Sequence, residues 1–84
     1  MISLMGKLAQ FGKVAVRIFG NDHPPPHFHV TAPDFRAIVA IDTLEVLAGQ
    51  MPRDVLETIS TWARANRNAL IADWNAYNPG LAVD

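Results

Sequence analysis

Hydrophobic and polar residues alternate near the beginning of the chain. Between Lys13 and Phe19 the β-branched residues Val14, Val16 and Ile18 fall on one side, and the residues between them fall on the other. Successive side chains of a strand point to opposite faces, so a period of two is typical of a strand with one buried face. We therefore expect a half-buried strand over this segment.

Three more segments have patterns that predict strands. They are His27–Ala32, Arg36–Ile41 and Leu44–Leu47. Pro33-Asp34-Phe35 favours a turn between the first two segments, because aspartate after proline is a common turn pair. Asp42-Thr43 predicts a tight connection before the last segment, which Gly49 is expected to end.

The second half of the chain changes to a helical period. Pro52 suits the first turn of a helix, and the apolar residues that follow stay within one arc of about 120° when each residue turns by about 100°. These residues are Val55, Leu56, Ile59, Trp62, Ala63, Leu70, Trp74 and Tyr77. Because the phase continues through Asn66, we expect one long helix over residues 52–77, with at most a bend near Asn66. Asn78-Pro79-Gly80 is expected to stop it.

The order of these elements predicts an α+β fold. Consecutive strands with short connections favour an antiparallel meander, and one amphipathic helix must cover a sheet face. We therefore expect a four-stranded antiparallel meander sheet with one long C-terminal helix packed on one face, and an open second face. The single domain is expected over residues 13–84, after a partly ordered lead-in over residues 1–12, where Gly6 and Gly12 interrupt any period.

The composition narrows the function classes. The chain has 84 residues, half of them hydrophobic, and it has no cysteine. A domain of this size in an oxidising compartment usually carries disulfides, so we expect a cytoplasmic location. No apolar run approaches the ~20 residues that span a bilayer, so no membrane partner is expected. The hydrophobic fraction could leave an apolar patch for a homodimer or for another bound protein.

The charge balance argues against a DNA partner. Seven Lys and Arg residues face eight Asp and Glu residues, for a net charge of −1, whereas a nucleic-acid-binding domain normally has a basic excess. The basic residues are unevenly placed, however. Up to residue 36 the chain has Lys7, Lys13, Arg17 and Arg36 against only Asp22 and Asp34. This part of the chain either forms a weakly cationic face or carries ordinary solvated charges.

All three histidines lie within the segment Asp22–Val30. His23 is followed by Pro24, Pro25 and Pro26, which lack amide protons and favour a stiff, extended loop. A stiff loop loses little conformational entropy when it binds a partner. The segment is therefore the main candidate for a functional surface.

His27 and His29 are expected to share one face of their strand, because side chains two apart point the same way. Phe28 and Val30 should face the core, since a one-residue slip would expose both of them. Antiparallel pairing then brings Arg17 to the histidine face. We expect both imidazoles to be exposed beside Arg17 and to stay out of the core.

One interpretation of the segment is a metal site. His27 and His29 would supply two imidazole ligands, and Asp22 or His23 could be the third. Without cysteine a closed structural zinc site is not expected, and no carboxylate at a fixed helical spacing supports the histidines. We therefore expect no metal and no cofactor, with zinc or nickel bound no more tightly than about 1 µM.

A second interpretation is a metal-independent ribonuclease. One imidazole of His27 and His29 would take the proton of the ribose 2′-hydroxyl, and the other would protonate the leaving oxygen. Arg17 would stabilise the charge that develops on the phosphate. These three residues are the candidate catalytic residues.

A third interpretation is a docking surface for another protein, and a fourth is a purely structural role. The candidate binding residues of the docking surface are Asp22, His23, Pro25, Pro26, His27 and His29. In the structural interpretation Asp22 caps a turn or accepts from backbone amides, and the histidines bond to backbone at the edge of the sheet.

Several motifs resemble a bacterial family named domain of unknown function 4160. The motifs are Val14–Phe19, Asn21-Asp22-His23, Pro25–Val30, Leu47-Ala48-Gly49, Met51-Pro52, Trp62 and Trp74. The resemblance extends from about Phe11 to Trp74, whereas the first ten residues and Pro24 depart from the family pattern.

The resemblance implies a partner more than a reaction, because the family has no established activity. It implies a neighbouring gene for another small protein, in an arrangement similar to toxin–antitoxin pairs, and weakly an RNA-directed activity. We therefore expect an interaction module of a toxin–antitoxin-like two-gene system with a small partner protein. The alternative is a metal-independent ribonuclease, with RNA as a partner, and the third is a mononuclear metal-binding protein.

Overall fold

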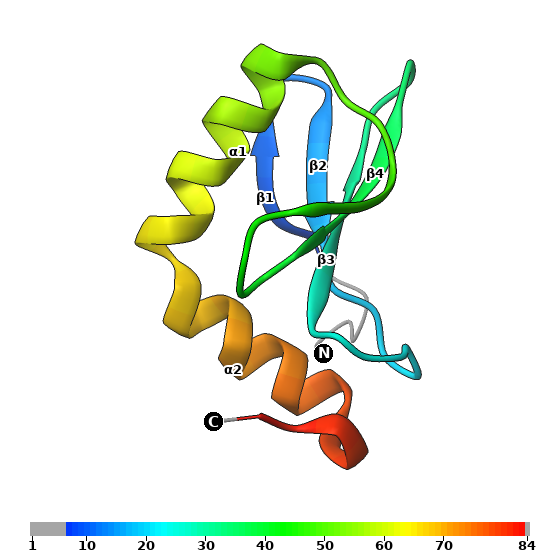
Figure 1. Ribbon diagram of the computed structural model, residues 1–84, viewed down its shortest axis with the longest axis vertical. Coiled ribbons are helices and arrows are strands. Elements are labelled where there is room, and N and C mark those ends of the chain that lie inside the picture. The colour runs from blue at the N-terminus through cyan, green and yellow to red at the C-terminus, as the bar shows by residue number, and fades with distance from the viewer. Residues whose placement is uncertain (1–6, 84) are drawn as a thin grey trace.

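The alternating segments form one antiparallel sheet, and the helical segment packs against it. The computed structural model describes residues 7–83. Five strands follow one another across the sheet in the order β1-β2-β3-β4-β5. They are β1 (Lys7–Phe11), β2 (Val14–Arg17), β3 (His27–Thr31), β4 (Arg36–Ala40) and β5 (Val46–Gly49), followed by α1 (Arg53–Ala65), α2 (Arg67–Tyr77) and the short 3₁₀ helix η1 (Pro79–Leu81). Figure 1 shows both α-helices along one side of the sheet. The α+β meander is confirmed.

The sheet has one strand more than the four predicted. The additional strand β1 lies within the segment expected to be a lead-in, of which residues 1–6 are outside the described part of the chain. Gly12 does not interrupt the pattern there. It has a φ of 60° in the two-residue turn between β1 and β2, a conformation that glycine adopts without strain in tight hairpins.

The last strand begins two residues later than predicted. Leu44 has a φ of 62°, which is incompatible with a strand, and β5 begins at Val46. Gly49 ends the strand, as predicted, and has a φ of 74°. A Cβ atom at Gly49 would lie 2.1 Å from the Arg36 carbonyl oxygen. No other residue fits this position without a shift of the backbone.

Two helices replace the single long helix that the apolar phase predicted. They are divided at Asn66, whose backbone has left the helical region with φ −119° and ψ 21°. The Asn66 side-chain amide donates to the Trp62 carbonyl oxygen at 2.8 Å, so it competes with the backbone for that acceptor. The helix axis changes direction at this point (Figure 1). The apolar phase nevertheless continues, because Ile59 and Ala63 of α1 and Leu70 and Trp74 of α2 are all buried.

The core lies between the helices and one face of the sheet. Its buried members are Val16, Ile18, Phe28, Val30, Val39, Ile41, Ile59, Ala63, Leu70 and Trp74. The alternate residues of the strands form the opposite face, called here the open face. Across it His29 pairs with Arg17 and with Ile38, and Thr31 pairs with Ala15 and Arg36. No helix within residues 7–83 combines the length and apolar character needed to cross a membrane.

Candidate functional site

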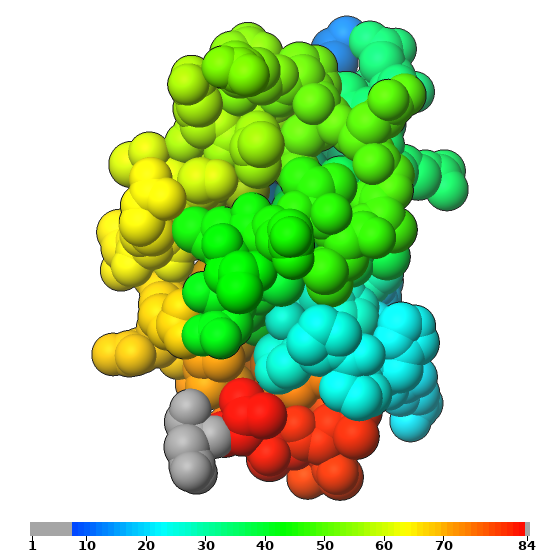
Figure 2. All heavy atoms as spheres, viewed as in Figure 1, coloured from blue at the N-terminus to red at the C-terminus, as the bar shows by residue number. Residues whose placement is uncertain are grey.

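The loop between β2 and β3 is fastened to the end of α2 by one buried side chain. Asn78, at the end of α2, accepts a hydrogen bond from the backbone amide of Asp22 at 2.9 Å. Its amide group donates to the Phe19 carbonyl oxygen at 3.0 Å and to the Trp74 carbonyl oxygen at 3.3 Å. Figure 2 shows the loop, in cyan, lying directly against the red C-terminal segment. This contact sets the position of Asp22 in the fold.

Asp22 is the centre of a polar cluster with two histidines, called here the His–Asp cluster. His27 Nε2 lies 2.8 Å and His29 Nε2 3.1 Å from Asp22 Oδ2. The other carboxylate oxygen, Oδ1, accepts from the backbone amide of His23 at 2.9 Å. The loop therefore orients the carboxylate so that one oxygen faces both imidazoles.

Burial distinguishes the two imidazoles of the cluster. The His27 residue is 1 % exposed, and its ring centre lies 5.2 Å from that of Trp74. Its Nδ1 lies 2.8 Å from the Pro25 carbonyl oxygen. The His29 side chain is 22 % exposed, and its ring packs edge-on against Phe19 at 4.5 Å. Of these two imidazoles, only that of His29 is exposed to solvent.

The expected exposure of His27 is wrong, although the strand parity behind it is right. Phe28 and Val30 face the core, and His29 pairs with Arg17 on the other face. His27 also points away from the core face, but it lies at the first position of β3. There the loop folds back over it and Trp74 packs beside it, so a residue on the open face is fully covered.

The groups around Asp22 lower the pKa of its carboxyl. Burial raises the pKa of this carboxyl, but the hydrogen bonds from His29 and from the His23 amide, together with His27, outweigh burial and hold the pKa below its ordinary value. Asp22 is therefore an ionised carboxylate near neutral pH. It faces two nitrogen atoms, which makes the cluster suitable for holding a cation.

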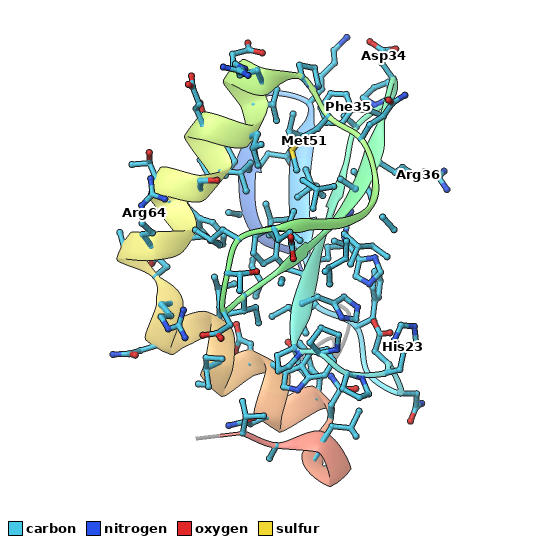
Figure 3. All side chains as sticks on the ribbon, viewed as in Figure 1. His23, Asp34, Phe35, Arg36, Met51 and Arg64 are labelled. Carbon is cyan, nitrogen blue, oxygen red and sulfur yellow. The ribbon has the colours of Figure 1, made fainter. Side chains whose placement is uncertain are left out.

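The remaining predicted site residues take different positions. His23 is 82 % exposed on the loop, with Nε2 3.8 Å from Asp22 Oδ1; Figure 3 shows it near the outer side of the loop. Pro25 and Pro26 act through their carbonyl oxygens, which face His27 and the Ile41 amide. The prolines thus shape the cluster, while Pro25 is also exposed and Pro26 half-buried on the loop.

The basic residues gather on another part of the open face. One hollow of about 450 Å³ is lined by Lys13, Arg17 and Arg36. These three residues are called here the cationic face. A second hollow of about 330 Å³ adjoins it and is mostly apolar. Thr31 and Arg36 line both hollows; the apolar one is also lined by Phe19, His29, Ala37, Ile38, Ala48 and Gly49. In Figure 3 Arg36 extends away from α1 and from Arg64 on that helix.

The cationic face has no carboxylate partner within residues 7–83. The ion pairs found within residues 7–83 lie elsewhere: they join Asp22 to the histidines and Arg67 to Asp42. Arg17 only reaches the Thr31 hydroxyl, at 3.4 Å. Lys13 and Arg36 are exposed and Arg17 is half-buried, so three positive charges line one hollow in a chain whose net charge is −1.

Sequence reasoning missed Asn78 as a positioning residue. Its place after the helix suggested only a stop signal. Its contacts join segments more than fifty positions apart, which no local pattern reports. Trp74 was expected in the core and is there, but its second role as a cover for His27 has no signal in the sequence.

Comparison with known proteins identifies a family and no function. No curated protein matches the chain, and no solved structure matches it. The model of one protein family, described as "Domain of unknown function (DUF4160)", matches residues 14–75. This match covers more than half of the chain and includes the whole His–Asp cluster, Arg17 and both tryptophans. The chain therefore belongs to the DUF4160 family, as the motifs of its loop and strands predicted.

Proposed function

We propose that this chain is an interaction module whose open face binds an acidic segment of a small partner protein. The observation that carries the proposal is the cationic face: Lys13, Arg17 and Arg36 line one hollow without a carboxylate partner in the described chain. Charges of one sign left unpaired on one face favour a ligand of the opposite sign.

The neighbouring apolar hollow supports a protein segment as the occupant. Phe19, Ile38 and Ala48 line it beside the cationic face. Apolar anchors in a hollow supply most of the affinity at protein interfaces, while charges at the rim supply orientation and association rate. A segment with one apolar side chain among acidic residues fits this arrangement.

A two-gene arrangement similar to toxin–antitoxin pairs would supply such a partner in the same cytoplasm. The support for it is the family membership, together with the resemblance that implies a second small protein encoded beside members of the family. In this arrangement the chain and its partner are made together, so a surface with unpaired charges is covered soon after synthesis.

The ribonuclease alternative is weakened by burial. A two-imidazole mechanism needs both rings within hydrogen-bond reach of the RNA, and His27 is 1 % exposed. His29 and Arg17 remain next to each other on the open face. RNA is therefore kept as a contrary outcome of the test below.

The test is capture of the partner from the native host with charge-reversed variants. Arg17→Glu with Arg36→Glu changes the cationic face, and Arg53→Glu with Arg64→Glu is the matched control on exposed positions of α1. We expect a protein that binds the unaltered chain and the control equally, and binds the Arg17/Arg36 variant at least about 10-fold more weakly. Its binding should weaken as salt rises.

Three results would count against the proposal. Equal loss of binding in the helix control would place the interface elsewhere. Recovery of RNA, with capture abolished by nuclease, would favour the nucleic-acid alternative. Recovery of a second copy of the chain as the only bound species would replace a heterologous partner by a homodimer.

A further inference from the structure

We propose that Asp22, His27 and His29 bind a divalent transition-metal ion, with Zn²⁺ as the first candidate. The site adjoins the proposed docking surface, because His29 also lines the apolar hollow and pairs with Arg17. Metal binding by the purified chain is measured without a partner, so the two proposals are tested separately. The sequence left a mononuclear site with Asp22 or His23 as third ligand as an alternative, but predicted no tight metal binding, because no carboxylate at a fixed helical spacing supports the histidines. The fold brings the Asp22 carboxylate to them through the loop.

The three donor atoms converge to the size of a metal site. Both Nε2 atoms lie within 3.1 Å of Asp22 Oδ2, and all three donor atoms lie within 4.8 Å of one another. Tetrahedral bonds of about 2.0–2.2 Å separate neighbouring ligands by about 3.3–3.6 Å. Small side-chain rotations would therefore place an ion between these atoms.

Both ring nitrogens of His27 face oxygen atoms, and this arrangement favours a positive charge at the site. Nδ1 lies 2.8 Å from the Pro25 carbonyl oxygen, and Nε2 lies 2.8 Å from Asp22 Oδ2. Both oxygens can only accept, whereas a neutral imidazole has one N–H to donate. One contact would then press a nitrogen lone pair against an oxygen lone pair. If Nδ1–H donates to Pro25, a metal ion bound to Nε2 and Oδ2 supplies the charge.

The surroundings of the ligands are those of a supported metal site. Metal-binding histidines usually donate their other ring N–H to a carbonyl or carboxylate, which fixes the ring and the tautomer. Pro25 provides that carbonyl for His27. The His23 amide holds Asp22 Oδ1 and leaves Oδ2 for the ion, and Asn78 fastens the backbone of Asp22.

The cluster is accessible to an ion from one side only. The side chains of Asp22 and His29 are 15 % and 22 % exposed, whereas His27 closes the inner side. With three protein ligands and an outward opening, a fourth position remains for water. Imidazole and carboxylate donors suit Zn²⁺, Ni²⁺, Cu²⁺ and Fe²⁺, and the absence of cysteine disfavours a closed structural zinc site.

The experiment is titration of tag-free protein with Zn²⁺ after treatment with a chelator. We expect one ion per chain, bound more tightly than about 1 µM. Asp22→Asn and His29→Ala should each weaken binding about 100-fold, at least as much as the loss of an outer-sphere contact. His23→Ala removes an exposed imidazole from the same loop and should leave the affinity unchanged. Circular dichroism checks that each variant is folded, and His27→Ala is avoided because it could unfold the chain.

A second readout separates a metal ion from a proton at the same place. In the zinc-loaded protein, nitrogen-15 spectra of the His27 ring should show a proton on Nδ1 and none on Nε2. No saturable binding of Zn²⁺, Ni²⁺, Cu²⁺ or Fe²⁺, with both His27 nitrogens protonated, would overturn the proposal in favour of an imidazolium–carboxylate pair. Equal weakening by His23→Ala would show that the assigned ligand set is wrong.

Discussion

The two ends of the open face are built on the same strands but differ in what covers them. At one end His27 lies under the loop and beside Trp74, and its polar atoms all have partners. At the other end Lys13 and Arg36 are exposed, and within residues 7–83 neither has an ion-pair partner. We propose an ion at the closed end and a partner at the open end.

This difference shows that strand parity and burial are separate properties. Parity fixes which face a side chain joins, because a strand alternates. Burial depends on what the rest of the chain lays over that face. His27 and His29 share a face, but only His27 lies where α2 and the loop close over the sheet.

The largest effect should come from removing the cover of the closed end. Trp74 is fully buried, and its ring N–H donates to the Leu81 carbonyl oxygen at 3.2 Å. Trp74→Ala should lower the free energy of unfolding by about 3–5 kcal/mol, a large part of the stability of a small domain. Urea denaturation followed by circular dichroism measures this. A loss below about 1 kcal/mol would mean that Trp74 is not packed as described.

The next effect compares the two histidines of β3 in metal-free protein. His27→Ala removes a fully buried ring together with its contacts to the Pro25 carbonyl and the Asp22 carboxylate, and it should cost about 2–3 kcal/mol. His29→Ala removes a half-exposed ring and should cost about 1 kcal/mol or less. The sequence predicted both imidazoles to be exposed, and exposed positions would give a small cost for both. If urea denaturation showed equally small losses of unfolding free energy for both variants, His27 would have to be exposed.

A smaller effect should distinguish two asparagines of the C-terminal segment. Asn78→Ala should cost about 1–3 kcal/mol, because it leaves the Asp22 amide and the Phe19 carbonyl without their partner. Asn75→Ala is the matched control, since its contacts with Val83 are exposed. Amide hydrogen exchange of Asp22 should rise only in the Asn78 variant. Equal exchange in both variants would exclude Asn78 as the anchor of the loop.

The smallest effect on stability is expected at the open end. Arg36→Ala removes an exposed charge and Arg17→Ala a half-buried one, neither with an ion-pair partner in the described chain, so each should change the free energy of unfolding by no more than about 0.5 kcal/mol. The same variants should weaken partner binding. A loss of several kcal/mol in urea denaturation would show that these residues serve the fold and would remove the basis of the docking proposal.

Local patterns predicted most of the fold. Alternation located β2, β3 and β4 within two residues of their ends, and the apolar phase identified which residues of α1 and α2 are buried. The apolar phase could not reveal the division at Asn66, because it is the same in α1 and in α2. β1 was missed because Gly12 interrupts a period and also forms a hairpin turn, and the pattern does not distinguish the two.

The candidate site was located by sequence but not assembled by it. The segment Asp22–Val30 was identified from its histidines, and the face of His29 and Arg17 was predicted correctly. The contact of Asp22 with both imidazoles depends on Asn78 and on the path of the loop. Residue spacing named Asp22 as one of two candidate third ligands, but its position against both imidazoles depends on contacts between distant parts of the chain.

The contrast between the closed and open positions of β3 can be measured by chemical modification of the three histidines. Metal-free protein is treated with diethyl pyrocarbonate in the presence of a chelator, and each site is followed by mass spectrometry. We expect His23 to react fastest and His29 more slowly, while His27 should react only as the closed end opens. Modification of His27 as fast as His29 would show that the two positions are equally open and that the loop and Trp74 do not cover His27.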